Sequence, residues 1–262
     1  MVDVLEKIVA HKRAELEGYD FADVEQKAKA ESRRVISMSE AIKNSTKGGI
    51  IAELKRKSPS KGWIKEAADV ETIVAGYRES GAAACSVLTN EEFFGGSLEF
   101  LTRARAVAGD MPLLRKEFIV DARQIYEARV AGADAVLLIA SCLGVEECAY
   151  LAEVAHSVDL EVLLEIHSEA ELSHLNENVD MLGVNNRNLG SFVTDINNSF
   201  SLAQVMRERG GDIVLVSESG IDASDTIKSL QNVGFGGFLI GETFMKTENP
   251  PATLAQLIAE IC

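Results

Sequence analysis

Residues 50–62 read IIAELKRKSPSKG, an apolar run that acquires charges before it turns. The run over 50–55 predicts a β-strand, and Ser58-Pro59-Ser60 predicts the start of a loop. Side chains alternate along a strand, so Glu53 and Lys55 point to the same side. A strand that is apolar along its length and charged at its end fits a closed sheet with a polar rim.

Seven further short apolar runs follow the first, separated by amphipathic stretches that predict helices. The runs are apolar throughout, as strands covered on both faces are. The predicted strands span residues 50–55, 84–88, 113–116, 135–139, 161–166, 181–185, 213–218 and 237–240. The predicted helices between them include residues 70–79, 124–131, 145–155 and 196–207.

Eight strand and helix units, at a spacing of roughly 20–35 residues, predict an α/β protein with a closed (β/α)8 TIM barrel. An open doubly wound sheet is the alternative, but no G-x-G-x-x-G motif opens a helix here. We expect residues 1–262 to form a single barrel domain. Residues 1–45 read helical and have no linker rich in Pro or Gly, so we expect a helical extension packed on the barrel.

The composition excludes several classes of partner. The 262 residues carry a formal net charge of −15, which disfavours nucleic acid and anionic membrane surfaces because both are polyanions. The first ten residues lack the apolar run of a signal peptide, and no segment is long enough to span a membrane, so we expect a cytoplasmic protein. The four cysteines and four histidines lack metal-ligand spacing, so neither a metal site nor a disulfide is expected.

Polar residues recur where the predicted strands end, which in a (β/α)8 barrel is the face that carries catalytic groups. Besides Glu53 and Lys55, these strand ends supply Lys116, Glu165, Asn185, Arg187, Glu218 and Ser219. Any one of them could instead be a helix cap or a solvated loop residue, and Glu53 with Lys55 could be a structural ion pair. Together they predict one charged mouth, because buried charges are costly unless they are paired or used.

Two glycines and a set of apolar residues flank these groups. Gly220 and Gly241 follow the seventh and eighth strands, where barrels of this type commonly hold a phosphate by backbone N–H groups. Apolar side chains after other strands predict a pocket for a flat apolar group of the substrate. They are Trp63, Phe93, Phe94, Phe118 and Leu189.

The motifs IIAELKRKSPSKG, SVLTNEEFFGGS, LLRKEFI, VLLEIH, GVNNRNL, VSESGI and FLIGETFM resemble, in order and spacing, those of indole-3-glycerol-phosphate synthases. The resemblance covers about residues 48–246, and the Glu-x-Lys-x-x-Ser-Pro-Ser motif is its most specific part. It implies a carboxy-lyase of tryptophan biosynthesis. The enzyme would close 1-(2-carboxyphenylamino)-1-deoxyribulose 5-phosphate to indole-3-glycerol phosphate, with loss of CO₂ and water and without a cofactor.

The resemblance also implies roles for individual residues. Lys116 matches the general acid, and Glu165 matches the residue that stabilises a cationic intermediate or takes up a proton. Lys55 matches a lysine near the substrate carboxylate, either as an anchor or as a second acid. The remaining matches are Glu53 and Asn185 for orientation, Ser58, Arg187 and Ser219 for substrate contacts, Gly220 and Gly241 for phosphate, and Phe94, Phe118, Leu137 and Leu189 for the anthranilate pocket.

Two residues depart from the family's pattern: Glu117 stands where Asp is usual, and Glu242 stands where a small hydroxyl residue is frequent. We expect the Gly241 N–H to contact phosphate and the Glu242 carboxylate to point away. We also expect a neighbouring lysine and partial burial to lower the pKa of Lys116.

Other functions stay open at this stage. The alternatives are another phosphate-binding barrel, such as phosphoribosylanthranilate isomerase or the tryptophan synthase α-subunit, and a barrel without catalysis. As for assembly, we expect a monomer, with a weak homodimer as the alternative.

Overall fold

A closed ring of eight parallel strands forms the centre of the protein in the computed structural model, which describes residues 4–18, 21, 23–188 and 193–262. The strands are β1 (Ile50–Leu54), β4 (Ala84–Leu88), β5 (Leu113–Lys116), β6 (Ala135–Ile139), β7 (Glu161–Ile166), β8 (Met181–Asn185), β9 (Val214–Glu218) and β10 (Gly237–Ile240). The ring closes because β1 pairs with both β4 and β10. The predicted (β/α)8 barrel is confirmed, and no strand boundary differs from the prediction by more than one residue.

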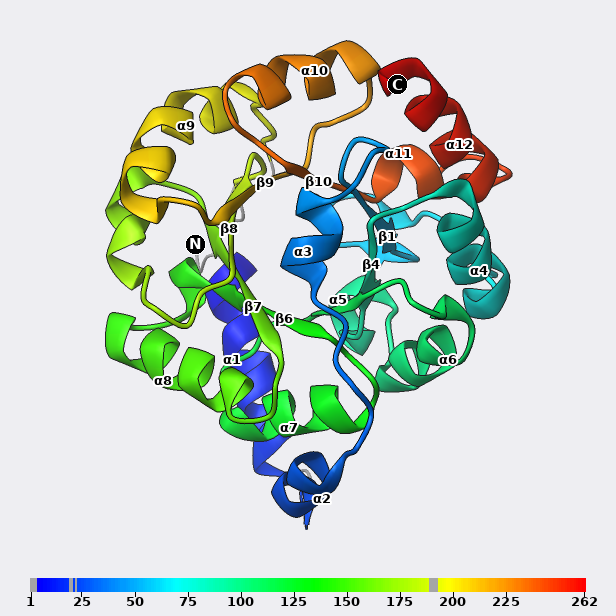
Figure 1. Ribbon diagram of the computed structural model, residues 1–262. Helices are drawn as coiled ribbons and strands as arrows, with labels where there is room; N and C mark the ends of the chain where they lie inside the picture. Colours follow the sequence, from blue (N-terminus) through cyan, green and yellow to red (C-terminus); the bar gives the residue numbers. More distant parts are fainter. Residues whose placement is uncertain (1–3, 19–20, 22, 189–192) are drawn as a thin grey trace.

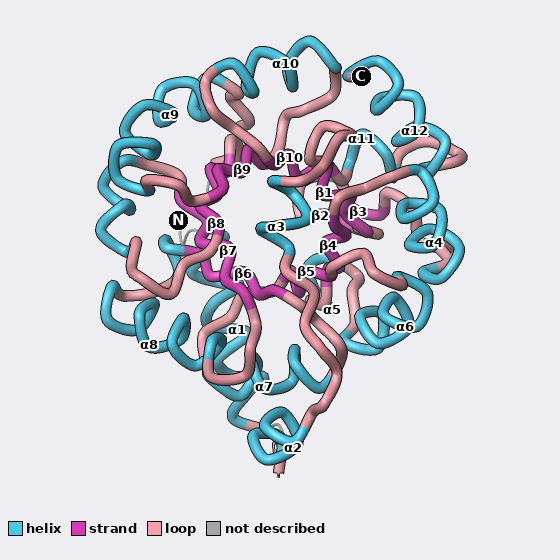
Figure 2. The backbone as a smooth tube through the Cα atoms, in the orientation of Figure 1, coloured by secondary structure: helices cyan, strands magenta, loops and turns pink. Residues whose placement is uncertain are grey.

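Helices surround the ring (Figures 1 and 2). They are α4 (Val70–Ser80), α6 (Leu98–Ala108), α7 (Ala122–Val130), α8 (Val145–His156), α9 (Asn197–Gly210), α10 (Ser224–Asn232) and α12 (Pro250–Ile261). After β7 the short 3-10 helix η2 (Glu169–His174) takes the place of an α-helix. Local signals set several ends: Asp69 caps α4 through the Thr72 N–H, and Gly81 ends it in the left-handed conformation.

Strand alternation separates two apolar layers. On β1, Ile50, Ala52 and Leu54 pack outward against the helices, whereas Ile51 packs inside the barrel. Glu53 follows Ile51 on the inward face, so its carboxylate lies at the barrel's C-terminal mouth. The same alternation brings one inward side chain from the end of each strand to this mouth.

Several short helices and strands lie in the loops at the mouth of the barrel. The loop after β1 folds into a two-stranded hairpin of β2 (Lys57–Ser58) and β3 (Gly62–Trp63). The other short elements are α5 (Glu91–Phe94) after β4, η1 (Ala140–Cys142) after β6 and α11 (Glu242–Met245) after β10.

The N-terminal extension runs from one end of the barrel to the other through α1 (Val4–Glu17), α2 (Val24–Ala30) and α3 (Met38–Lys43). Leu5 and Ile8 of α1 pack with apolar residues at the mouth. Met38 and Ile42 of α3 belong to the same inner cluster at the opposite end, where α3 lies across the centre of the ring (Figure 1). The extension therefore contacts both ends of the barrel.

Candidate active site

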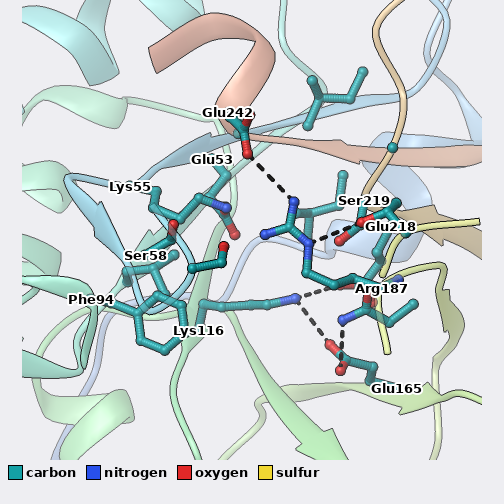
Figure 3. A pocket seen from close by; sticks show the side chains of 18 of the residues that line it. Glu53, Lys55, Ser58, Phe94, Lys116, Glu165, Arg187, Glu218, Ser219 and Glu242 are labelled. Atoms are coloured by element: carbon teal, nitrogen blue, oxygen red, sulfur yellow. Dashed lines mark hydrogen bonds and ion pairs between the residues drawn. The ribbon is translucent and has the colours of Figure 1, made fainter. Parts of the chain in front are cut away.

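A cavity of about 270 Å³ opens at the C-terminal ends of the strands. It contains nearly all of the residues that the sequence placed at the mouth (Figure 3). These are Glu53, Lys55, Ser58, Phe94, Lys116, Phe118, Leu137, Glu165, Asn185, Arg187, Ser219, Gly220 and Gly241. Glu218, also at a strand end, lines the cavity as well. Of the other candidates, Trp63 and Phe93 do not line it, and Leu189 lies outside the described residues.

Lys116 lies between two buried carboxylates. Its Nζ is 3.2 Å from Glu165 Oε2 and also donates a hydrogen bond to Glu218 Oε2. The Asn185 amide donates to Glu165 Oε1 at 3.0 Å, which fixes that carboxylate from the neighbouring strand. His167 Nε2 lies 3.5 Å from the same oxygen. The end of β5 thus presents one ammonium group to the ends of β7 and β9.

The two carboxylates differ in acidity although both contact Lys116. Burial raises the pKa of Glu218 to about 8, and the nearby Glu165 and Glu53 add to the rise. Burial also acts to raise the pKa of Glu165, but Lys116, His167 and Asn185 outweigh it and lower that pKa below its ordinary value. One carboxyl at the site therefore carries a proton at neutral pH while the other is ionised.

The expectation that Lys116 has a lowered pKa is wrong. Burial of the ammonium group acts in that direction, but Glu218, Glu165 and Glu53 together raise the pKa above the ordinary value for lysine. Lys55 is the second lysine of the site, but its Nζ lies 2.7 Å from Glu53 Oε1, so the Glu53 carboxylate offsets its positive charge. Lys116 is consequently held in its protonated form, as a proton donor requires.

Close approach explains the glycine after β10. A Cβ at Gly241 would lie 3.0 Å from Glu53 Cβ and would overlap the Glu53 carboxylate. Glycine at this position thus leaves room for the Glu53 to Lys55 ion pair inside the mouth.

The turn after β9 has two consecutive residues with positive φ, Ser219 at 68° and Gly220 at 76°. Asn186 pins this turn by donating to the backbone oxygens of Glu218 and Ser219 at 3.0 and 3.1 Å. Successive residues in unusual conformations turn backbone N–H groups into a concave anion site. The cavity wall includes this turn.

Glu242 lines the cavity, contrary to the expectation that its carboxylate points away. The carboxylate accepts from Lys61 at 2.5 Å. It also accepts from Arg187 at 3.4 Å (Figure 3). Burial acts to raise the pKa of Glu242, but these two cations lower it below its ordinary value. The negative charge beside the two glycine turns is neutralised by its partners.

The apolar wall is smaller than predicted. The rings of Phe94 and Phe118 lie 6.1 Å apart, and Leu137 completes the wall with Leu88 and Ile139. Phe93 does not line the cavity and packs edge-on against His11. Trp63 does not line it either, because its side chain is 48% exposed and lies beside Arg56 and Lys57.

Sequence reasoning assigned no role to Glu218, although it named this residue at a strand end. The signal was present, since Val214, Val216 and Glu218 share the inward face of β9. The structure supports Ser58 as a candidate for substrate contact, because it lines the cavity and its buried Oγ has no hydrogen-bond partner among the described residues. Within the same part of the chain, no group of three His, Cys, Asp or Glu residues could hold a metal ion.

These groups supply a proton donor, a protonated and an ionised carboxyl, a second ammonium group, two glycine turns and an apolar wall. Such a set suits proton transfers on an anionic substrate with a flat apolar part. The fold and the site define a (β/α)8-barrel enzyme that uses general acid and base chemistry.

Comparison with known proteins gives the family. The profile of the family described as indole-3-glycerol phosphate synthase matches residues 5–257. The curated indole-3-glycerol phosphate synthase of Bacteroides thetaiotaomicron is 51% identical over 264 aligned residues, covering 100% of both chains. That of Carboxydothermus hydrogenoformans is 44% identical over 231 residues, covering 87% of this chain and 86% of its own. The chain belongs to the indole-3-glycerol phosphate synthase family, whose members are carboxy-lyases.

Similar solved structures share the fold at low sequence identity. A 3-hexulose-6-phosphate synthase superimposes with a TM-score of 0.64 at 15% identity, over 82% of this chain and all of its own. A chain of the tryptophan synthase complex of Pyrococcus furiosus gives a TM-score of 0.60 at 13% identity, over 82% and 97%. These likenesses support the barrel alone.

Proposed function

We propose that the cavity closes 1-(2-carboxyphenylamino)-1-deoxyribulose 5-phosphate to indole-3-glycerol phosphate, releasing CO₂ and water. The family assignment supports the reaction. The observation that carries the assignment of residues is the position of Lys116, between Glu165 and Glu218 and beside an apolar wall. The reaction balances without an oxidant, a reductant or a cofactor.

The substrate has three parts that match three regions of the cavity. The aryl ring fits the wall of Phe94, Phe118 and Leu137, since flat rings pack well on aromatic side chains. The phosphate fits the turns at Gly220 and Gly241, with Arg187 alongside. The carboxylate and the ribulose carbonyl then face Lys55 and Lys116, two of the lysines that line the cavity.

Ring closure forms a bond between the aryl carbon that bears the carboxylate and the carbonyl carbon of the sugar. Lys116 donates a proton to the carbonyl oxygen as this bond forms, so no alkoxide accumulates. A preorganised ammonium group in a site walled from water acts more strongly on such a developing charge than it would in bulk solvent. The bond to the carboxylate then breaks, and its electron pair returns to the ring as CO₂ leaves.

Dehydration completes the indole. The hydroxyl formed in the first step departs as water after accepting a proton, and the neighbouring methylene carbon loses a proton. Glu165, which is ionised, suits the stabilisation of the cationic intermediate or the uptake of this proton. Glu218, whose pKa is raised to about 8, can return a proton to Lys116 through their hydrogen bond.

Lys55 serves as the carboxylate anchor in this proposal. Its ion pair with Glu53 holds the ammonium group at the rim, and Glu53 is itself buried. Ser58 and Ser219 add hydroxyl contacts, and Asn185 keeps Glu165 oriented.

The experiment is direct. The purified chain is mixed with the carboxyphenylamino sugar phosphate, and indole fluorescence is followed in parallel with Lys116→Ala. We expect a signal that rises with the wild-type chain and turnover at least about 10²-fold lower in the variant, because general acid catalysis contributes on that order. No signal from the wild-type chain would refute the reaction, and near-normal turnover by the variant would refute the role of Lys116.

We further propose a monomer that works in the cytoplasm on a small phosphorylated substrate. The four cysteines are free thiols, which fits a reducing compartment. No helix in the described part of the chain has the length and apolarity to cross a membrane. Large apolar side chains exposed in that part are few and are spread over β3, α7, α8 and the loop after β8, which favours a monomer. Sedimentation equilibrium tests this, and a stable dimer would contradict it.

A further inference from the structure

The N-terminal helix α1 places a buried lysine against the active-site wall. Lys12 is 4% exposed, and its Nζ lies 3.2 Å from Glu117 Oε2. A second contact, 2.9 Å to Glu15 Oε2, lies within the helix. Lysine is almost never buried unless it is paired, so the contact with Glu117 accounts for the burial of this side chain.

Glu117 is a hub that joins segments far apart in the sequence. Its carboxylate accepts from Asn90 Nδ2 at 3.0 Å, from Thr89 Oγ1 at 3.3 Å and from the Phe118 N–H at 2.9 Å. With Lys12 included, three segments meet on one carboxylate: α1, the loop after β4 and the end of β5. Glu117 is one methylene longer than the Asp that is usual in the family, and it is the carboxylate of this longer side chain that makes these contacts.

The hub lies next to the groups proposed for catalysis. Glu117 is flanked in sequence by Lys116 and Phe118, and Asn90 caps the short helix α5, which carries Phe94. Both phenylalanines form the apolar wall, and Leu5 and Ile8 of α1 pack into the same inner cluster. A movement of the Glu117 carboxylate would therefore move the proton donor relative to the ring on which it acts.

We infer that Lys12 is a positioning residue for ring closure, acting through Glu117 on Lys116 and Phe118. The inference rests on the proposed role of Lys116 as proton donor. Lys12 supplies the positive charge opposite a carboxylate that is 3% exposed and whose other partners among the described residues, Thr89, Asn90 and the Phe118 N–H, are neutral. A buried carboxylate without a counter-ion is costly, so loss of the Lys12 charge favours a shift of the Glu117 side chain and of the end of β5 next to it.

The test compares variants of the full chain by steady-state turnover and thermal denaturation. Lys12→Met keeps the apolar stem and removes the charge. Lys12→Met with Glu117→Gln removes the charge of both partners, and Lys12→Arg keeps the cation. The matched control is Arg13→Met, which breaks the neighbouring ion pair from α1 to Glu147 on α8, where the two side chains are 49% and 35% exposed.

Measured on folded protein, Lys12→Met should lower kcat at least about tenfold and change KM little, since misplacement by about 1 Å costs up to 10²-fold in rate. The double variant and Lys12→Arg should recover most of the loss, while Arg13→Met should stay within about twofold of wild type, as surface pairs contribute little.

Two results would overturn the inference. One is a Lys12→Met variant with wild-type kcat, whatever its melting temperature, because Lys12 would then be structural only. The other is a double variant no better than Lys12→Met, because the loss would then not depend on the Glu117 charge. A wild-type chain without turnover would refute the proposed function itself, and the inference with it.

Discussion

Glu218 and Glu165 contact the same ammonium group, but their pKa values are shifted in opposite directions. The difference arises from their partners. Glu165 has Asn185 and His167 as well as Lys116, and these lower its pKa. Burial dominates at Glu218, and its Oε1 has no hydrogen-bond partner among the described residues. Two carboxyl groups pushed apart in pKa are the arrangement by which one site both donates and accepts protons.

Glu218→Gln tests the raised pKa of Glu218, because it should change how the free energy of unfolding depends on pH. The folded chain holds the Glu218 proton up to about pH 8, whereas an unfolded glutamate loses it near 4.5. The stabilisation by this proton is complete below about pH 4.5 and is lost as pH rises through about 8. The amide cannot ionise, so the stability of the variant relative to wild type should rise by up to about 4 kcal/mol between pH 5 and pH 9, at about 1.4 kcal/mol for each pH unit below 8.

Thermal denaturation across this pH range measures the gain, with Glu153→Gln on the exposed face of α8 as the control. The control removes the same charge from a solvated position, so its offset from wild type should not depend on pH. A constant offset for Glu218→Gln as well would contradict the raised pKa. Turnover of Glu218→Gln should fall about 10²-fold, on the scale of general acid and base catalysis.

The positions of these side chains could be predicted from the sequence, but their pKa values could not. Strand alternation places Glu53, Lys116, Glu165 and Asn185 at the mouth, because a parallel barrel brings its strand ends together. It does not tell which charges become neighbours. The pKa of Lys116 depends on carboxylates from β1, β7 and β9, which are far apart in the chain, so its direction could not be inferred from β5 alone.

The turn after β10 joins the loop after β1 to the end of the cavity where we propose that the phosphate binds. Glu242 on α11 takes Lys61 and Arg187 as partners, so a phosphate bound there would compete with this carboxylate for the same cations. Its effect on anion binding is therefore unfavourable in two ways, through direct repulsion and through occupation of the cations.

Glu242→Gln should strengthen phosphate binding. Loss of the charge frees Lys61 and Arg187, and we expect the Kd for inorganic phosphate to fall about threefold to fivefold, the range of a partly exposed ion pair. Isothermal titration at low salt measures it. Glu248→Gln removes an exposed charge six residues away and, in the same titration, should change the Kd by less than about twofold, because an exposed charge interacts weakly across solvent. Weaker binding in Glu242→Gln would mean that the carboxylate orients Arg187 for the phosphate.

Strands were predictable here because each is a short apolar run covered on both faces. The loops were less so. Trp63 was expected over the cavity, yet the β2–β3 hairpin holds it among cations on the surface. Arg56, which precedes the hairpin, also lies over the ring of Phe100, a contact between distant residues that has no local sequence signal.

The candidate active site lies at one end of the barrel, a buried ion-pair cluster lies at the other, and the N-terminal extension contacts both ends. At the end opposite the mouth, Asp134 is fully buried and holds the extension to the barrel. It accepts from Arg33 at 2.7 Å, from Arg105 at 2.8 Å, and from the N–H groups of Ile36 and Leu113 at 3.0 and 2.9 Å. The path of the extension could not be predicted because it depends on such pairs between distant residues.

Glu161 makes a second junction at the same end. Its carboxylate accepts from the N–H groups of Met38 and Ser39 at 2.7 and 2.9 Å, and so caps α3 from the start of β7. Negative charge at a helix N-terminus is favourable for both its hydrogen bonds and the helix dipole. The buried Asp134 and the partly buried Glu161 thus hold α3 and the preceding segment at the end opposite the mouth, while α1 reaches the mouth.

Asp134→Asn should lower stability while leaving catalysis intact. The amide cannot serve as counterion to Arg33 and Arg105, and breaking a buried pair in this way costs about 3–5 kcal/mol. For a chain of this size the melting temperature should fall by roughly 6–20 °C. Because the mouth lies at the other end, kcat at a temperature where both proteins are folded should stay within about twofold.

Differential scanning calorimetry and the fluorescence assay measure the two effects on the same samples. Asp110→Asn is the control, since Asp110 is an exposed acid at the same barrel end and its loss should cost no more than about 0.5 kcal/mol. An unchanged melting temperature for Asp134→Asn would show that the extension is held by its apolar contacts alone. A fall in kcat with the fold intact would show instead that strain at the closed end reaches the catalytic lysine, and stability and chemistry would then be coupled through the barrel.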